Sequence, residues 1–257
     1  MITTFPSAEA RVRIRALLVR YGSRVVLDVP DLVLGTGVTA LTGANGSGKT
    51  TLLKALALLI RPSAGTVELE QDGSGTGPRT ASGRHRAAVG FLPQAPEFPG
   101  HFTVRDAITY SAWLRGIPRA RRGEAVDRAV EDLNLTPAAD TPLRNLSGGN
   151  RQRVHIAQAL VHEPAVVLLD EPTTGIDIEH RIALREYLAR CGSTRCVVMS
   201  THHTEDVELL ADRVVSLREG SVVFDGTPER LMARASNGTP AARSIERALH
   251  DLGGANA

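Results

Sequence analysis

Residues 43–50 read Gly-Ala-Asn-Gly-Ser-Gly-Lys-Thr, a glycine followed by four residues and then Gly-Lys-Thr. This spacing is typical of a loop that wraps a polyphosphate, because glycines permit the positive φ angles and close backbone approach that turn successive N–H groups inward. In such a loop Lys49 supplies positive charge to the β- and γ-phosphates, and the Thr50 hydroxyl takes one position on a magnesium ion. The stretch therefore predicts a nucleoside triphosphate site.

Two adjacent carboxylates, Asp170 and Glu171, follow an uninterrupted apolar run at 166–169. Such a run predicts a strand buried on both faces of a parallel sheet, with its carboxyl end at an active site. We expect Asp170 to hold magnesium, and Glu171 to orient or deprotonate the water that attacks the γ-phosphate. The alternative is a solvated strand end, which the apolar run before the pair and Pro172 after it disfavour.

A second anion-binding pattern lies at 146–152, which reads Leu-Ser-Gly-Gly-Asn-Arg-Gln. Ser-Gly-Gly at the start of a predicted helix offers a hydroxyl and several unpaired N–H groups to an anion. From these residues alone, a helix N-cap with a flexible glycine turn is an equally good interpretation. Because the first loop already surrounds the phosphates of its own nucleotide, a second anion site favours a partner molecule.

Strands and helices must position these residues. Alternating charged and apolar residues predict a strand at 11–17, and apolar residues at 25–27 and 32–34 suggest further antiparallel strands. Residues 38–42 predict a short strand that enters the phosphate loop, and 51–60 predict the helix that leaves it, with its N-terminal dipole facing the phosphates. This order of strand, loop and helix disfavours a chance glycine-rich turn.

The rest of the chain continues as alternating elements, with one long interruption and a tail. Residues 71–86 are rich in Gly, Ser, Thr and Arg and predict a long, mobile surface loop, and the tail after 235 predicts a helix at 243–252. Further strands are expected at 65–70, 89–94, 166–169, 196–200, 213–217 and 221–224, and helices at 104–114, 119–133, 147–162, 179–190, 204–211 and 228–235.

The composition bounds the class of protein. A chain of 257 residues with 42% hydrophobic content can bury one large domain or a domain with a subdomain. The 30 Lys and Arg residues nearly balance 28 Asp and Glu residues, which does not favour a nucleic-acid-binding surface. Cys191 and Cys196 are too few for a disulfide framework or a zinc site and predict reduced thiols in a cytosolic protein. We expect no secretory signal and no membrane-spanning segment.

Together these residues resemble the ATP-binding cassette (ABC) family, the nucleotide-binding subunits of ABC transporters. The resemblance covers roughly 11–235 and rests on six motifs in the family's order. They are the phosphate loop 43–51, Gln94 after its strand, the signature 146–150, the run 166–171, the segment 174–177, and His202 after Ser200 and Thr201.

The resemblance implies an α/β fold of the P-loop NTPase class and ABC type. It would have a mostly parallel core sheet, an N-terminal antiparallel β subdomain and a helical subdomain at about 103–162. The ATPase domain would extend over 1–235, followed by a C-terminal tail at 236–257.

The resemblance also assigns roles to single residues, with ATP and Mg²⁺ as cofactors. Tyr21, which the sequence alone leaves open between strand-end packing and base stacking, would stack on adenine. Gln94 would reach the magnesium and the attacking water, and its loop would contact the membrane subunit. His202 would contact the γ-phosphate and hold Glu171 in line.

A second group of residues would act on the nucleotide of another subunit. Ser147 and Gly149 would bind the γ-phosphate of ATP held by the opposite subunit, and Asp177 would lie at the seam of this head-to-tail dimer. The expected catalytic residues are Glu171, His202 and Gln94; the nucleotide-binding residues are Tyr21, Gly43, Ala44, Asn45, Gly46, Ser47, Gly48, Lys49, Thr50, Thr51, Ser147, Gly148, Gly149 and Asp177; and the magnesium ligands are Thr50, Gln94 and Asp170.

Three positions depart from the family's common pattern. Asn150 replaces the glutamine common at the end of the signature, Gly175 and Ile176 stand where many members have Ala-Leu, and His203 follows His202. None of these departures removes a residue needed for hydrolysis.

The implied function is ATP hydrolysis coupled to transport. A homodimer or heterodimer of ATP-binding subunits would drive a separate transmembrane permease subunit from the cytoplasmic face of the cell membrane, with no nucleic acid as partner. The spacing of 102–108, followed by a compact helical region, resembles multidrug, antibiotic or polysaccharide exporters more than importers.

Three alternatives of other classes remain. A soluble ribosome factor of the superfamily typically carries two cassettes, and a DNA-repair protein needs a long coiled coil for which 94–147 leaves no room. A nucleotide-binding regulator without turnover is disfavoured by Glu171 and His202.

Overall fold

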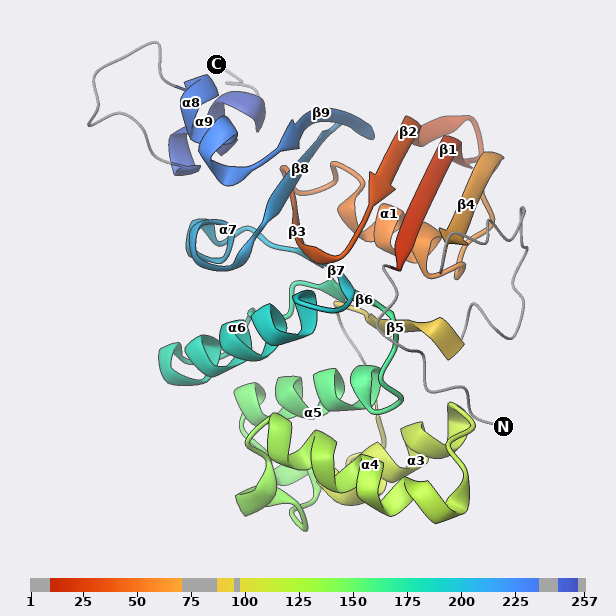
Figure 1. The fold of residues 1–257 in the computed structure, drawn as a ribbon, viewed down its shortest axis with the longest axis vertical. Helices are drawn as coiled ribbons and strands as arrows, with labels where there is room; N and C mark the ends of the chain where they lie inside the picture. The colour runs from red at the N-terminus through yellow and green to blue at the C-terminus, as the bar shows by residue number, and fades with distance from the viewer. Residues whose placement is uncertain (1–9, 71–86, 95–97, 236–244, 254–257) are drawn as a thin grey trace.

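An antiparallel sheet and a mostly parallel sheet form the upper part of the molecule in Figure 1, and a group of helices forms the lower part. The structure is a computed structural model and describes residues 10–70, 87–94, 98–235 and 245–253. The surface loop predicted at 71–86 lies outside these residues. Within them, no helix combines the length and the apolar character that crossing a membrane requires.

The antiparallel sheet has the strand order β2-β1-β4, with β1 at Arg11–Tyr21, β2 at Arg24–Leu34 and β4 at Ala64–Glu70. The prediction of separate strands at 25–27 and 32–34 was wrong, because β2 is continuous. Pro30 is exposed within β2, an edge strand of this sheet where a missing N–H is tolerated.

The core sheet has the order β5-β6-β7-β3-β8-β9. All neighbouring pairs run parallel except β8 and β9, which form an antiparallel edge. Every residue of β6 and β7 is buried, as the apolar run at 166–169 predicted for a strand covered on both faces. The strands are β3 Gly37–Thr42, β5 Val89–Leu92, β6 Val166–Asp170, β7 Cys196–Ser200, β8 Arg213–Arg218 and β9 Ser221–Gly226.

Helix α1, Lys49–Leu56, leaves the phosphate loop and ends earlier than predicted. The sequence pattern extended the helix to residue 60, but Leu58 adopts the left-handed conformation with φ 53°. The N–H of Leu58 donates to Ala55 and that of Leu59 donates to Lys54, which satisfies the last carbonyls and closes the helix. The apolar periodicity thus continued past the point where the backbone turned.

Three helices form the helical subdomain: α3 at Val104–Leu114, α4 at Arg119–Asp132 and α5 at Gly148–Leu160. Thr103 caps α3, because its hydroxyl accepts from the Asp106 N–H at 3.1 Å while its own N–H donates to the Asp106 carboxylate at 3.2 Å. The buried faces of these helices share one hydrophobic cluster with β6 and β7 of the core sheet. The helical subdomain is therefore packed on the core and not tethered to it by loops alone.

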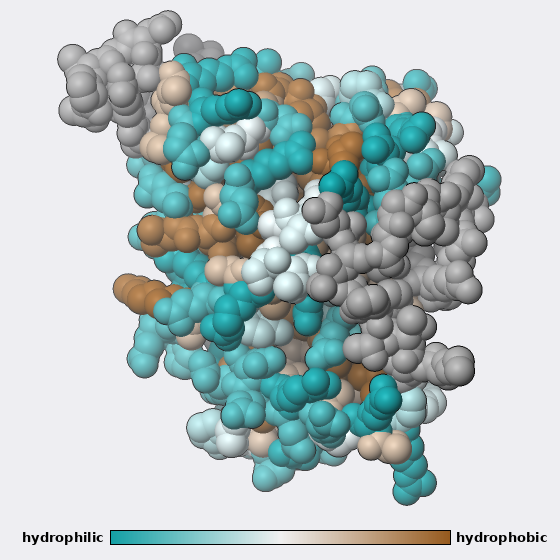
Figure 2. All heavy atoms as spheres, in the orientation of Figure 1, coloured by the Kyte–Doolittle hydropathy of each residue, from teal (hydrophilic) through white to brown (hydrophobic). Residues whose placement is uncertain are grey.

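Helices α6, Ile178–Gly192, and α7, Thr204–Leu210, follow strands β6 and β7. Both helices contact β3, and they also contact each other. Figure 2 shows a mainly hydrophilic face with small apolar patches. Exposed apolar residues include Ile178 and Ile182 on α6, where Ile178 is 77% exposed, and Leu209 on α7.

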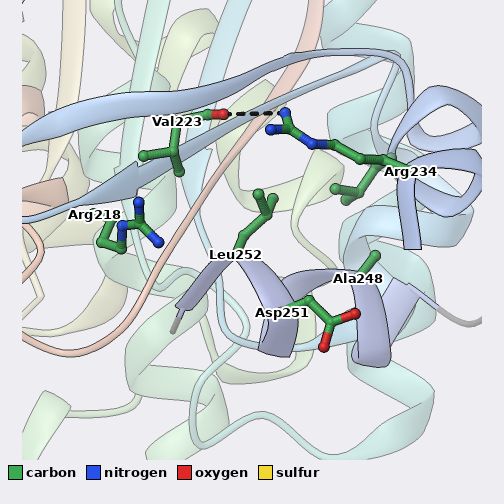
Figure 3. A pocket seen from close by; sticks show the side chains of 7 residues that line it. Arg218, Val223, Arg234, Ala248, Asp251 and Leu252 are labelled. Atoms are coloured by element: carbon green, nitrogen blue, oxygen red, sulfur yellow. Dashed lines mark hydrogen bonds between the residues drawn. The ribbon is translucent and has the colours of Figure 1, made fainter. Parts of the chain in front are cut away.

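The last two described helices, α8 at Pro228–Ala235 and α9 at Ile245–Gly253, pack against each other and against β8. Ile245 and Ala248 of α9 are buried in a cluster with core-sheet residues. A cavity of about 360 Å³ lies between these helices and the β8–β9 hairpin, with Arg218 and Arg234 on opposite sides (Figure 3). Its lining residues are Arg218, Val223, Leu231, Arg234, Ala248, Asp251 and Leu252.

Candidate active site

The phosphate loop lies between the end of β3 and the start of α1. Gly43 and Gly48 have φ angles of 136° and 107°, a region that favours glycine. A Cβ on Gly43 would lie 2.2 Å from the Leu217 carbonyl oxygen, and one on Gly48 would lie 2.7 Å from Leu27 Cδ2. Conformation therefore favours glycine at both positions, and at Gly43 the Leu217 carbonyl oxygen also leaves no space for a Cβ.

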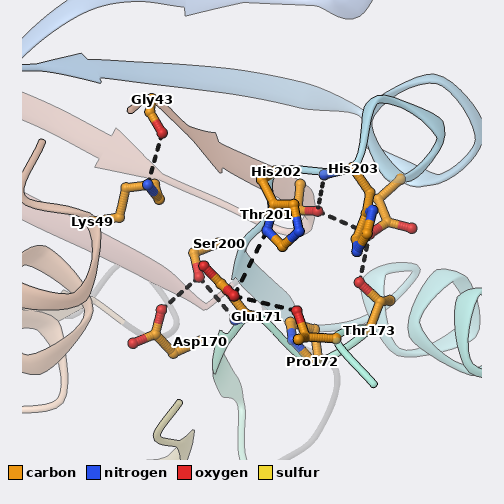
Figure 4. A network of polar contacts seen from close by, with 12 residues as sticks. Gly43, Lys49, Asp170, Glu171, Pro172, Thr173, Ser200, Thr201, His202 and His203 are labelled. Carbon is orange, nitrogen blue, oxygen red and sulfur yellow. Dashed lines mark hydrogen bonds and ion pairs between the residues drawn. The ribbon is translucent and has the colours of Figure 1, made fainter. Parts of the chain in front are cut away.

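Lys49 is folded back over its own loop. Its Nζ donates to the carbonyl oxygen of Gly43 at 2.7 Å and to that of Ala44 at 3.1 Å, as Figure 4 shows for Gly43. Burial lowers the pKa of Lys49, while the nearby charges of Glu171 and Asp170 act in the opposite direction. Because an ammonium has three donors, Lys49 can keep loop contacts and still bind an anion.

The groups around the loop fit a polyphosphate with a bound divalent cation. Within the described residues, no side chain caps the N-terminus of α1 at Gly48, and the buried Ser47 hydroxyl has no hydrogen-bond partner. The buried Oδ2 of Asp170 also lacks a partner among them. Unpaired donors at a helix N-terminus suit phosphate oxygens, and an unpaired carboxylate oxygen suits Mg²⁺.

Ser200, the last residue of β7, connects the carboxylate of Asp170, at the end of β6, to the backbone of Glu171. Its hydroxyl donates to Asp170 Oδ1 at 2.6 Å and accepts from the Glu171 N–H at 2.9 Å. Ser200 was not predicted to have a role of its own. A polar residue that ends an otherwise apolar strand was the available signal.

Glu171 leaves the strand through a left-handed backbone, with φ 51°. This conformation is costly for a residue with a side chain and is held by the Ser200 bond. The Glu171 carboxylate accepts from the Thr174 hydroxyl at 3.2 Å, and its Oε2 lies 3.7 Å from Nδ1 of His202 (Figure 4). The turn therefore directs Glu171 toward His202, while Asp170 stays in the sheet.

The two adjacent histidines have different surroundings. The His202 side chain is 52% exposed and makes the contact with Glu171, and its ring lies 4.2 Å from that of His203. The His203 N–H donates to the Thr201 hydroxyl at 3.0 Å, and burial, followed by the charge of His202, lowers the pKa of His203. The structure thus places His202 beside the expected base.

The signature residues lie at the N-terminus of α5. Ser147 is its N-cap, with the hydroxyl accepting from the Asn150 N–H at 3.2 Å. A Cβ on Gly149 would lie 3.7 Å from the Gly175 carbonyl oxygen, so the signature adjoins the segment that leads to Asp177. Asp177 caps α6, and the hydrogen bond from the His180 N–H lowers its pKa.

The shorter amide at Asn150 has a partner within its own subdomain. Its Oδ1 accepts from the guanidinium of Arg153, which also donates to the carbonyl oxygens of Leu133 and Asn134, each at 3.0 Å. Arg153 therefore joins α5 to the end of α4, and the Asn150 side chain binds Arg153 within α5.

Two expected site residues lie on the surface at strand ends. Tyr21 ends β1 with 56% of its area exposed, which leaves the ring accessible for stacking. Gln94 is exposed just after β5.

The start of β5 is bound by two basic side chains. The Val89 carbonyl oxygen accepts from Arg115 Nη1 at 3.2 Å and from His162 Nε2 at 3.3 Å. Burial lowers the pKa of His162 to about 3, so its neutral ring donates to Val89.

The structure thus brings the expected residues together in two groups. Lys49, Asp170, Glu171 and His202 gather at the carboxyl edge of the core sheet, whereas 147–149 and Asp177 gather at the helical subdomain. Among the described residues, no hydrogen bond or ion pair joins 147–150 to 43–51.

Comparisons with known proteins identify this arrangement. Residues 33–174 match a family model described as "ABC transporter". Because that match spans more than half of the chain, the chain belongs to the ABC transporter family, as one of its ATP-binding domains with ATPase activity.

Individual relatives have different transport roles. The chain is 36% identical over 219 residues to "Nod factor export ATP-binding protein I" of Burkholderia orbicola (strain AU 1054), covering 83% of this chain and 69% of that protein. It is 38% identical over 214 residues to "Molybdenum import ATP-binding protein ModC" of Aromatoleum aromaticum (strain DSM 19018 / LMG 30748 / EbN1), covering 81% and 55%. The chain therefore spans between about half and two thirds of these two relatives.

A solved structure supports the same assignment. CbiO1 from Clostridium perfringens, described as part of the ABC transporter complex cbiONQ, superposes with a TM-score of 0.74 at 27% sequence identity. The match covers 86% of this chain and 90% of that chain. The prediction of an ABC-type α/β fold with an antiparallel β subdomain and a helical subdomain is confirmed.

Proposed function

We propose that this chain hydrolyses Mg²⁺-ATP as a head-to-tail dimer and thereby drives transport through a separate membrane permease subunit. The observation that carries the proposal is the division of the expected site into two groups within one chain. The group around Lys49 contains a complete set of phosphate, metal and base functions. The group around Ser147 offers anion-binding N–H groups, and no hydrogen bond or ion pair among the described residues joins it to the phosphate loop.

Each residue near the phosphate loop has a distinct chemical task. The loop N–H groups and Lys49 bind the phosphates, and Thr50, Asp170 and Gln94 hold Mg²⁺, which when bound neutralises developing charge on the β- and γ-phosphates. Glu171 orients the attacking water or takes a proton from it, and His202 holds Glu171 in line. Tyr21 stacks on adenine.

The partner chain supplies the remaining contacts. Ser147 and Gly149 of one protomer bind the γ-phosphate held by the other, so ATP closes the dimer and hydrolysis releases it. Asp177 and the neighbouring Ile178 lie at the seam. Ile178 is 77% exposed, and burying it in the closed dimer would add apolar contact area.

The test is the ATP-dependent oligomeric state of Glu171→Gln. This change keeps the side-chain size and removes the base, so we expect ATP binding to persist, turnover to fall by roughly a thousandfold, and a stable dimer to accumulate with Mg²⁺-ATP. Analytical ultracentrifugation with and without nucleotide measures the dimer. Glu124→Gln, an exposed change on α4, is the matched control.

Two outcomes would contradict the proposal. A wild-type rate of hydrolysis in Glu171→Gln would contradict the assignment of Glu171 as the base. A variant that binds ATP without turnover and stays monomeric at high protein concentration would contradict the proposed dimer.

We further propose that the transport is export from the cytoplasm, with this chain at the inner face of the cell membrane. The spacing of 102–108 before the compact α3–α5 region supports export, and one relative carries an export name. The test purifies the chain with its native membrane partner and reconstitutes both in vesicles with the ATPase facing outward. ATP-dependent accumulation of the cargo inside supports export, and ATP-dependent release from loaded vesicles supports import.

A further inference from the structure

A buried carboxylate outside the phosphate loop connects several elements around the site. Asp206 of α7 has 0% of its area exposed. Its Oδ1 accepts from Arg185 Nε at 2.7 Å, and its Oδ2 accepts from the hydroxyls of Thr173 at 2.7 Å and Thr201 at 2.9 Å. Because an ionised carboxylate only accepts hydrogen bonds, a single group can bind all three donors.

The two threonines belong to the two segments that carry the reacting side chains. Thr173 lies two residues after Glu171, and Thr201 directly precedes His202. Both threonines are buried, and the Thr201 hydroxyl also accepts from the His203 N–H. In Figure 4, Thr173 lies near the Glu171 turn and Thr201 near the histidines. One carboxylate oxygen is thus shared by the base segment and the histidine segment.

We propose, resting on the roles proposed above for Glu171 and His202, that Asp206 is a positioning residue for ATP hydrolysis. Its Oδ2 fixes the Glu171 segment relative to the His202 segment and so sets the 3.7 Å separation of their side chains. Errors of about 1 Å in the placement of reacting groups cost about a hundredfold in rate, so such a tie has a large effect on turnover. Arg185 orients the carboxylate through its bond to Oδ1.

The pattern of contacts distinguishes positioning from general stabilisation. A buried ion pair contributes little net stability compared with apolar packing, so the Arg185–Asp206 pair alone is a poor means of joining α6 to α7. Two directed hydroxyl bonds to one oxygen instead specify geometry. They come from the two segments whose relative position matters for the chemistry.

The experiment changes each threonine in two ways. Thr173→Val and Thr201→Val keep the shape and remove the hydroxyl, whereas Thr173→Ser and Thr201→Ser keep the hydroxyl. We expect kcat to fall about tenfold in each valine variant, the scale of one hydrogen bond to a charged group, with KM for ATP within about twofold of wild type. Each serine variant should restore kcat to within about twofold.

Glu205, which also contacts Arg185, provides a matched control. Glu205 contacts Arg185 Nη2 at 2.9 Å with its side chain 64% exposed, so Glu205→Gln changes that arginine's surroundings and leaves the threonine contacts in place. Its kcat should stay at the wild-type value. Asp206→Asn should lower kcat further than either valine variant at unchanged KM, because an amide has only one acceptor oxygen for three donors.

Thermal unfolding of every variant separates folding from positioning. Valine variants with wild-type kcat at a temperature where they are folded would overturn the positioning role, and so would serine variants as impaired as the valines. Glu171→Gln is measured in parallel. Wild-type turnover in Glu171→Gln would overturn the proposed function, whereas an inactive Glu171→Gln with fully active valine variants would overturn the role of Asp206 alone.

Discussion

The edge of the core sheet and the start of α5 are both suited to bind phosphate, but they are built differently. At the sheet edge, Lys49, Asp170 and Ser200 are buried; Lys49 donates to the loop carbonyl of Gly43, and the Ser200 hydroxyl donates to Asp170. At the start of α5, Ser147 is exposed and its hydroxyl accepts from the N–H of Asn150, in the first turn of the same helix. One site is preorganised by tertiary contacts, and the other is a helix N-terminus on a surface.

This difference shows what a single chain provides. Preorganised donors can stabilise negative charge on a bound nucleotide without reorganisation, and preorganised carboxylates can hold its cation. An exposed helix N-terminus contributes fully only when a ligand is brought to it and water is excluded. In the proposed dimer, the sheet edge would determine whether nucleotide binds and reacts, and the signature would determine how two chains respond to it.

The largest effect expected from breaking the sheet-edge network is that of Asp170→Ala. The change removes the proposed metal ligand and the acceptor of the Ser200 hydroxyl, so turnover should fall by roughly a thousandfold, the several kcal/mol that metal stabilisation supplies. Steady-state ATPase assays over a range of Mg²⁺ concentrations measure it. Asp225→Ala, which disrupts a surface pair with Arg213, is the control. Full activity in Asp170→Ala at ordinary Mg²⁺ would show that the metal is held elsewhere.

The next effect in size is on nucleotide affinity, through Lys49→Ala. Losing a charged donor to the phosphates should weaken ATP binding by roughly a hundredfold. Isothermal titration calorimetry measures the affinity. The chain contains one other lysine, Lys54 in the last turn of α1, so Lys54→Ala is a control of the same residue type in the same helix. Wild-type affinity in Lys49→Ala would contradict the phosphate-loop assignment.

The signature is tested most sharply by Ser147→Asp. Aspartate is a good N-cap, so the helix should keep its stability, but its charge repels the γ-phosphate of the opposite chain. We expect turnover to fall by at least about tenfold with ATP binding to the monomer unchanged. Activity and ATP-dependent dimerisation are measured together with thermal unfolding. Normal turnover and dimerisation would favour the interpretation of Ser147 as a helix cap alone.

Much of the fold could be predicted because local patterns and tertiary packing agree. The apolar run of β6 and the Thr103 cap of α3 each indicate the local structure through only a few neighbouring residues. The end of α1 could not be predicted, because the left-handed Leu58 interrupts a periodicity that the sequence continues. The order of strands in the core sheet also depends on contacts between distant segments.

The residues of the candidate site also fall into those that the sequence could predict and those that it could not. Lys49, Asp170 and Glu171 occur in local motifs whose spacing indicates their chemistry. Asp206 and Ser200 do not, because each acts through residues that are brought to it by folding: the partners of Asp206 are 5, 21 and 33 positions away in the chain. A buried acceptor of this kind is recognised only when its donors are seen together.

The smallest effect is expected at the departure from the family pattern, Asn150→Gln. If the terminal amide of the signature were itself a phosphate ligand, lengthening it by one methylene would change turnover strongly. In the structure, however, its oxygen accepts from Arg153, whose bonds to Leu133 and Asn134 do not depend on the amide.

We therefore expect turnover of Asn150→Gln within about threefold of wild type and a stability loss of about 1 kcal/mol, the worth of one hydrogen bond. ATPase assays and denaturant unfolding measure the two quantities, with Gln158→Asn on the same helix as the matched control. A tenfold or greater change in turnover at unchanged stability would show that the amide acts on the nucleotide, and would make the signature a more specific ligand site than an exposed helix N-terminus.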